Sequence, residues 1–105
     1  VRSHTHSGLD IAAPRGTPIK AAAAGTVTYS GNAGDGYGNY VVIAHTNGVQ
    51  TVYAHCSQLL VSKGQTISQG EVIAKVGSTG NSTGNHLHLE VRKNGITYNP
   101  QNYVY

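Results

Sequence analysis

Short runs of apolar residues, broken by glycine, asparagine and proline, dominate the chain. The clearest runs are 39–45 (NYVVIAH), 49–55 (VQTVYAH), 71–76 (EVIAKV) and 86–92 (HLHLEVR). They are rich in valine, isoleucine and tyrosine, which is typical of β-strands. An Asn-Gly pair separates the first two runs, and a second pair follows the last, so each position favours a hairpin turn. The pattern predicts an all-β protein, mainly an antiparallel sheet with long loops and little or no helix.

The alanine-rich segment 11–25 (IAAPRGTPIKAAAAG) is the one stretch that looks helical by composition. Its prolines and glycines, Pro14, Gly16, Pro18 and Gly25, argue against a helix, because proline removes a backbone donor and glycine favours turns. We expect two short extended pieces instead, near 18–22 and 25–30.

Length and charge narrow the functional classes. The 105 residues suit one domain, 1–105, and a chain beginning at Val1 without methionine suggests a piece excised from a longer protein. The net charge is +3, which favours an anionic polymer nearby, but the basic residues are scattered and give no nucleic-acid patch. No apolar run approaches the roughly 20 residues needed to span a membrane. We expect the domain to be monomeric.

Two histidines, His86 and His88, stand two residues apart in a predicted strand. Side chains i and i+2 of a strand share one face, so both rings project together. Such a pair makes a poor core but a good metal or proton-transfer group. His6 and Asp10, four residues apart near the start, offer a further nitrogen and oxygen. With one nitrogen from the pair they make three protein ligands, the number in a catalytic zinc site with an open position for water.

Three segments in order carry a resemblance to a known family: 6–27 (HSGLDIAAPRGTPIKAAAAGTV), 53–57 (YAHCS) and 77–100 (GSTGNSTGNHLHLEVRKNGITYNP). The chain resembles the lysostaphin-type (LytM-type) zinc metallopeptidases from about His6 to Pro100. The resemblance implies that His6, Asp10 and His88 bind one Zn²⁺. It implies catalytic roles for His55 and His86, and a small antiparallel sheet with a substrate groove.

The resemblance also implies a function. Family members hydrolyse peptide bonds in cross-links or stem peptides of bacterial peptidoglycan, so a zinc endopeptidase is expected. The expected location is extracellular, at the cell wall, in the periplasm or in a phage virion. Two polar loops, 30–39 and 77–85, are expected to line the groove for an extended peptide of small residues. Which of His55 and His86 acts as base, and which bond is cut, stay open.

Two other residues offer rival chemistry. Glu90 shares strand parity with the histidine pair, but a pairing with Arg92 is expected rather than a role as general base. Cys56 follows His55 directly, which invites a cysteine-peptidase interpretation. Neighbours in a strand face opposite ways, so Cys56 is expected to be a small buried residue. His4 and His45 are expected to be surface residues.

Two alternative functions remain from the sequence. A catalytically silent relative could bind cell-wall peptides or activate another hydrolase, although all five expected site residues are present. The segment 66–80 (TISQGEVIAKVGSTG) also resembles sheet segments of biotinyl and lipoyl carriers. It lacks the lysine at a hairpin tip that such carriers modify, which disfavours a carrier role.

Overall fold

The computed structural model describes residues 2–5, 8–34, 36–80, 84–93 and 96–98. Its strands are β1 (Arg2–Thr5), β2 (Gly8–Ala12), β3 (Pro18–Lys20), β4 (Gly25–Asn32), β5 (Asn39–Ala44), β6 (Val49–Leu59), β7 (Thr66–Ile67), β8 (Val72–Val76), β9 (His86–Lys93) and β10 (Ile96–Tyr98). The helical element within the described ranges is a single 3₁₀ turn, Thr46–Gly48. The predicted all-β class is confirmed.

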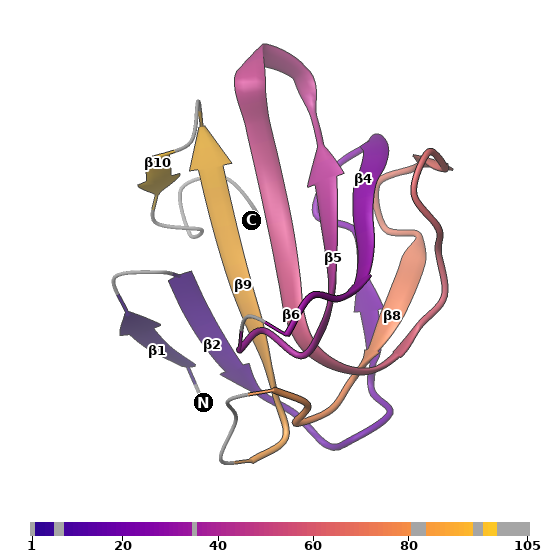
Figure 1. Cartoon of the computed structure of the whole chain (residues 1–105). Coiled ribbons are helices and arrows are strands. Elements are labelled where there is room, and N and C mark those ends of the chain that lie inside the picture. The colour runs from indigo at the N-terminus through magenta and orange to yellow at the C-terminus, as the bar shows by residue number, and fades with distance from the viewer. Residues whose placement is uncertain (1, 6–7, 35, 81–83, 94–95, 99–105) are drawn as a thin grey trace.

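The strands form one antiparallel sheet around the long central strands β6 and β9 (Figure 1). The order along the sheet is β1-β2-β9-β6-β5-β4-β7. β10 extends β9 as a hairpin, and β8 pairs with both β3 and the far end of β6. Strands from both ends of the chain, β2 and β9, therefore lie side by side.

Local sequence signals match the elements observed. The two runs around the first Asn-Gly pair are β5 and β6, and they are antiparallel partners. Asn47 and Gly48 both have positive φ, 59° and 75°, which is the conformation that this residue pair favours in hairpin turns. The alanine-rich segment 11–25 contains no helix, as its prolines and glycines predict; β2 ends in it at Ala12, β3 lies within it and β4 begins at its last residue, Gly25.

The two faces of β9 differ sharply in character. Leu89 and Val91 are buried on one face, where Leu89 joins the hydrophobic core with Tyr53 and Ile43. The alternate residues, including His88 and Glu90, are also buried but lie on the other face. The core cluster on the apolar face also contains residues of β3 and β8, including Ile19 and Ile73.

His45, expected at the surface, is half-buried and has both ring nitrogens hydrogen-bonded. Nδ1 lies 2.6 Å from the carbonyl oxygen of Ala24, and Nε2 lies 2.8 Å from Oγ1 of Thr51. The same hydroxyl lies 2.8 Å from the phenolic oxygen of Tyr53, which accepts the amide proton of Ala22 at 3.0 Å. This polar chain fastens the segment before β4 to β6, which gives His45 a structural role.

Among the described residues, no helix is long and apolar enough to cross a membrane.

Candidate metal and catalytic site

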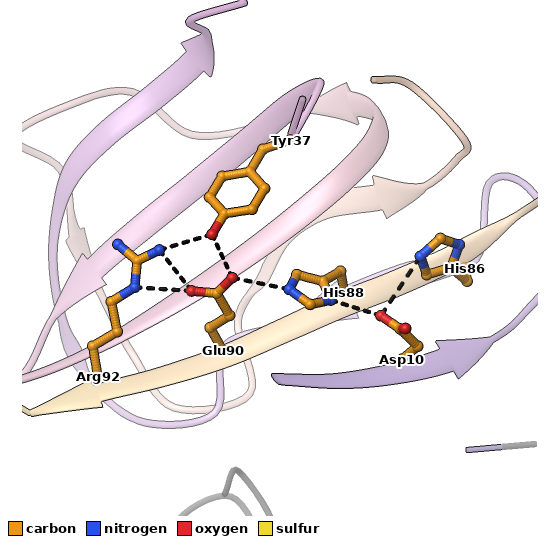
Figure 2. A network of polar contacts seen from close by, with 6 residues as sticks. All are labelled: Asp10, Tyr37, His86, His88, Glu90 and Arg92. Atoms are coloured by element: carbon orange, nitrogen blue, oxygen red, sulfur yellow. Dashed lines mark hydrogen bonds and ion pairs between the residues drawn. The ribbon is translucent and has the colours of Figure 1, made fainter. Parts of the chain in front are cut away.

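A row of polar side chains follows one face of β9: His86, His88, Glu90 and Arg92 (Figure 2). The antiparallel register of β2 and β9 sets Asp10 directly opposite His88. Oδ1 of Asp10 consequently lies 2.6 Å from Nδ1 of His88 and 3.7 Å from Nε2 of His86. Two of the three expected metal ligands are thus direct cross-strand neighbours, although 78 residues separate them in sequence.

His55 reaches the same face through an irregularity in β6. Asn39 pairs with Cys56 while Val41 pairs with Tyr53, so three steps along β6 match two along β5. The extra residue forms a β-bulge, a feature that re-aims a side chain. His55 has a φ of 64°, a left-handed backbone conformation that costs energy in a residue with a Cβ. As a result both Tyr53 and Cys56 enter the core, and the imidazole between them turns to the polar face.

The His55 ring is held beside the histidine pair by backbone groups. Its Nδ1 lies 2.7 Å from the carbonyl oxygen of Thr79, and its amide donates to the carbonyl of Tyr37 at 2.9 Å. The ring centre lies 4.9 Å from that of His86 and 6.0 Å from that of His88. Burial lowers the pKa of His55, and the two neighbouring histidines lower it further, although the Thr79 hydrogen bond opposes this. His55 is therefore neutral at neutral pH.

Two loops meet at the carbonyl that orients His55. A Cβ added to Gly38 would lie 2.4 Å from the carbonyl carbon of Thr79, and one added to Gly80 would lie 2.3 Å from the amide nitrogen of Gly38. Only glycine permits so close an approach, and both glycines have positive φ, 66° and 75°. The Thr79 hydroxyl donates to the carbonyl of Cys56 at 2.8 Å and accepts the amide proton of Asn39 at 3.1 Å. The expected groove loops 30–39 and 77–85 thus contact each other here.

Beyond His88 the polar row continues into a buried carboxylate network. Glu90 is fully buried, and its Oε2 lies 2.9 Å from Nε2 of His88 and accepts the Tyr37 hydroxyl at 2.5 Å. Its Oε1 accepts from Nε of Arg92 at 2.8 Å, which confirms the expected pairing. Burial acts to raise the pKa of Glu90, but the hydrogen bonds from His88, Tyr37 and Arg92 outweigh it and lower the pKa.

The carboxylates at both ends of the His88 ring affect its protonation. Burial alone would lower the pKa of His88, yet the hydrogen bonds and charges of Glu90 and Asp10 raise it. Without a metal ion, both ring nitrogens of His88 therefore face anions and favour the protonated ring.

Of the five expected site residues, the structure brings four together: Asp10, His55, His86 and His88. His6 lies outside the described residues, so its place as third ligand stays a prediction. Within the described ranges, no three His, Cys, Asp or Glu side chains form a group that could hold a metal ion. His4 has a described backbone in β1, paired with Leu9, and its role stays open.

Tyr37 and Thr79 contribute contacts at the site that were not predicted, and so does Glu90, apart from its expected pairing with Arg92. Tyr37 comes from the loop GDGYGN, where an aromatic residue between glycines was the available signal. Glu90 could be placed on the correct face by strand parity, but its contact with His88 depends on side-chain geometry.

Cys56 is fully buried, as expected from its position after His55. Burial raises the pKa of its thiol to about 12, so the nucleophilic thiolate is scarce. Its sulfur lies 3.5 Å from the carbonyl oxygen of Tyr53, within the core. These features disfavour the cysteine-peptidase interpretation.

A model of peptidase family M23 matches residues 4–100. The chain belongs to peptidase family M23. The match confirms the resemblance to lysostaphin-type peptidases, a family of peptidoglycan hydrolases. It covers every residue expected at the site.

Curated relatives support the family and differ in their described functions. The DD-carboxypeptidase/endopeptidase Mpg of Neisseria meningitidis serogroup B is 55% identical over 95 residues, which are 90% of this chain and 22% of that protein. The murein hydrolase activator NlpD of Salmonella typhimurium is 42% identical over 99 residues, 94% of this chain and 26% of that protein. The chain spans about a fifth to a quarter of the length of these relatives.

Solved structures share the fold over most of this chain. The catalytic domain of the antimicrobial peptidase lysostaphin from Staphylococcus simulans aligns with a TM-score of 0.88 at 31% identity, over 94% of this chain and 78% of that one. A zinc-containing peptidase from Vibrio cholerae aligns with a TM-score of 0.84 at 39% identity, over 89% of this chain and 28% of that one.

Proposed function

We propose that this chain is a zinc-dependent endopeptidase domain that hydrolyses peptide bonds in bacterial peptidoglycan. His6, Asp10 and His88 are the proposed metal ligands, and His55 and His86 the proposed catalytic residues. The observation that carries the proposal is the cross-strand pair of Asp10 and His88, 2.6 Å apart, with two further histidine rings beside it.

The donor set suits zinc. A carboxylate oxygen of Asp10 and the Nδ1 of His88 point toward one another, and these are donor types that zinc binds in catalytic sites. The other nitrogen of His88 faces a buried carboxylate, which is a common arrangement behind metal-bound histidine. A zinc ion held here would polarise the scissile carbonyl and lower the pKa of a bound water.

We assign the proton-accepting role to His55. Its Nδ1 donates to the Thr79 carbonyl, so the lone pair of the neutral ring is on Nε2. Burial favours this neutral form, which a base requires at neutral pH. Because the ring is fixed by backbone contacts, it needs little reorganisation to take the proton of the attacking water.

We assign charge stabilisation to His86. Its Nδ1 lies 3.0 Å from the carbonyl oxygen of Gly84, and its Nε2 is directed toward Asp10. From this position a protonated ring can donate to the developing oxyanion of the substrate carbonyl.

The family of peptidoglycan hydrolases and the murein hydrolase activator NlpD support peptidoglycan as the substrate, and relatives named as lipoproteins support the cell envelope as the site of action. Mpg is described as a carboxypeptidase/endopeptidase and lysostaphin as an antimicrobial peptidase. The net charge of +3 suits an acidic wall polymer. The similarity to NlpD supports a second candidate, an activator of another murein hydrolase without cleavage of its own.

The two candidates are separated by metal analysis and product mass spectrometry. The purified chain is assayed for zinc content and incubated with peptidoglycans that differ only in their cross-bridge. A peptidase binds one zinc and releases peptides carrying the mass of one added water. An activator releases no product alone but accelerates an added murein hydrolase. Zinc-loaded protein that gives neither result contradicts both candidates.

A further inference from the structure

Glu90 is a buried carboxylate with more partners than an ordinary ion pair requires. A buried carboxylate is destabilising unless hydrogen-bond donors satisfy its oxygens. Arg92 alone would balance the charge, since Nε and Nη2 lie 2.8 and 2.6 Å from Oε1. The second oxygen, Oε2, is nevertheless aimed at Nε2 of His88, 2.9 Å away.

Tyr37 sets the direction of hydrogen bonding in this network. Its hydroxyl accepts from Nη2 of Arg92 at 2.9 Å and so donates its own proton to Oε2 of Glu90 (Figure 2). Every group around Glu90 is thus a donor, and the carboxylate can only accept. Nε2 of His88 must therefore carry a proton. Asp10 faces Nδ1, so the metal-free ring favours a proton on both nitrogens, and the proton on Nδ1 is the one that a metal ion beside Asp10 would displace.

We propose that Glu90, held by Tyr37 and Arg92, is the positioning residue that fixes His88 as an Nδ1 metal ligand. The proposal rests on the proposed zinc site and deepens it. Glu90 touches neither substrate nor metal; it acts through the tautomer and ring orientation of His88. Since Tyr37 belongs to the loop before β5, this network also ties that loop to the metal ligand.

The variant Glu90→Gln tests the proposal by reversing one hydrogen bond. The guanidinium of Arg92 attracts the amide oxygen of the new side chain, so its NH₂ group faces His88 and donates to Nε2. The neutral ring then shifts its proton to Nδ1, where it blocks the metal. Glu71→Gln is the matched control: it removes the same charge, and the described contact of its carboxylate is the amide of Ser68.

Two readouts are measured on the whole chain. Competition with a chromophoric chelator gives the zinc Kd, which should rise roughly 10- to 100-fold in Glu90→Gln and stay unchanged in Glu71→Gln. Nitrogen-15 NMR of metal-free protein, at a pH where the ring is neutral, should show His88 with a proton on Nε2 in the wild type and on Nδ1 in the variant. Thermal unfolding of both metal-free variants checks the fold.

The outcomes separate this proposal from the zinc site on which it rests. An unchanged zinc Kd together with an unchanged tautomer in folded Glu90→Gln overturns the positioning role. Wild-type protein that binds no zinc refutes the proposed function, and the metal-free tautomer then decides whether Glu90 still directs the ring. If Glu90→Gln does not fold, Tyr37→Phe replaces it, with a several-fold higher zinc Kd expected and an unchanged Kd contradicting the proposal.

Discussion

His55 and His88 lie on the same face of one sheet with ring centres 6.0 Å apart, yet their surroundings shift their pKa values in opposite directions. His88 sits between the carboxylates of Asp10 and Glu90, which raise its pKa against the effect of burial. His55 contacts a backbone carbonyl and two other histidines, and burial lowers its pKa. Two chemically identical side chains are thus prepared for different tasks.

The difference originates in the backbone. β9 is regular, so alternation presents His88 to Asp10 on one side and to Glu90 along its own strand. β6 is interrupted by a bulge, and the left-handed conformation of His55 directs its ring toward the loop at Thr79. Regular strand geometry places the proposed ligand His88 between two carboxylates, and irregular geometry places the proposed base His55 beside a backbone carbonyl. Environments that separate the pKa values of neighbouring groups commonly separate their catalytic roles.

The largest expected effect comes from removing the Asp10 carboxylate, which faces Nδ1 of His88. Asp10→Ala should abolish activity and weaken zinc binding by at least ~100-fold, since it deletes a ligand rather than an outer-shell partner. Zinc content after dialysis and peptidoglycan turnover are the measurements. Retention of one zinc with wild-type affinity would refute the ligand assignment.

Removing either proposed catalytic histidine, His55 or His86, should slow turnover without weakening zinc binding. His55→Ala and His86→Ala should each lower kcat by about 10²- to 10⁴-fold while zinc binding persists, because neither is a proposed ligand. His88→Ala should lose zinc as well as activity. Zinc lost from His86→Ala but retained in His88→Ala would reverse the roles of the pair.

The opposite pKa shifts predict where activity declines on the acid side. A lowered pKa means that His55 stays neutral below the ordinary histidine value of about 6.5, and the base is lost only as pH falls further. NMR titration of the His55 ring, with the chain unfolded in denaturant as reference, should give a midpoint below that of the unfolded chain. A midpoint equal to or above the reference in folded protein contradicts the proposed base.

The smallest effect concerns the contact that orients His55. Thr79→Val removes a hydroxyl that makes two hydrogen bonds, each contributing about 1 kcal/mol, and frees the carbonyl to move. We expect kcat to fall by less than about tenfold, with zinc binding unchanged and recovery in Thr79→Ser. A wild-type kcat in Thr79→Val would mean that the glycine contacts alone hold the loop.

This loop contact also bears on substrate choice. Because Gly38 and Gly80 pack closely, exchanging loop 30–39 or shortening 77–85 disturbs the support of His55 as well as the expected groove. We predict that either loop change alters which peptide bond is cut, and product masses and kcat must be measured together to separate this from lost support of His55.

Much of the site could be predicted from strand periodicity. The parity of β9 correctly placed His86, His88 and Glu90 on one face, and Arg92 pairs with Glu90 as expected. The pairing of Asp10 with His88 could not be derived locally, because it depends on the register of strands from opposite ends of the chain. The family resemblance supplied that link.

The remaining features depend on tertiary geometry. Alternation treats residues 53–56 as a regular strand and would place His55 on the core side, so the bulge was not predictable from the run VQTVYAH. The contact of Tyr37 with Glu90 joins a glycine-rich loop to β9 across 53 residues of sequence. Periodicity carries no information on such loop contacts.

The most direct test of the account compares zinc-loaded wild type with zinc-loaded His55→Ala on one defined peptidoglycan. Mass spectrometry of the products should show peptides carrying one added water for the wild type. The variant should release the same peptides at least about 100-fold more slowly at equal zinc content. Absence of products from the zinc-loaded wild type, or equal rates from both proteins, would contradict the account.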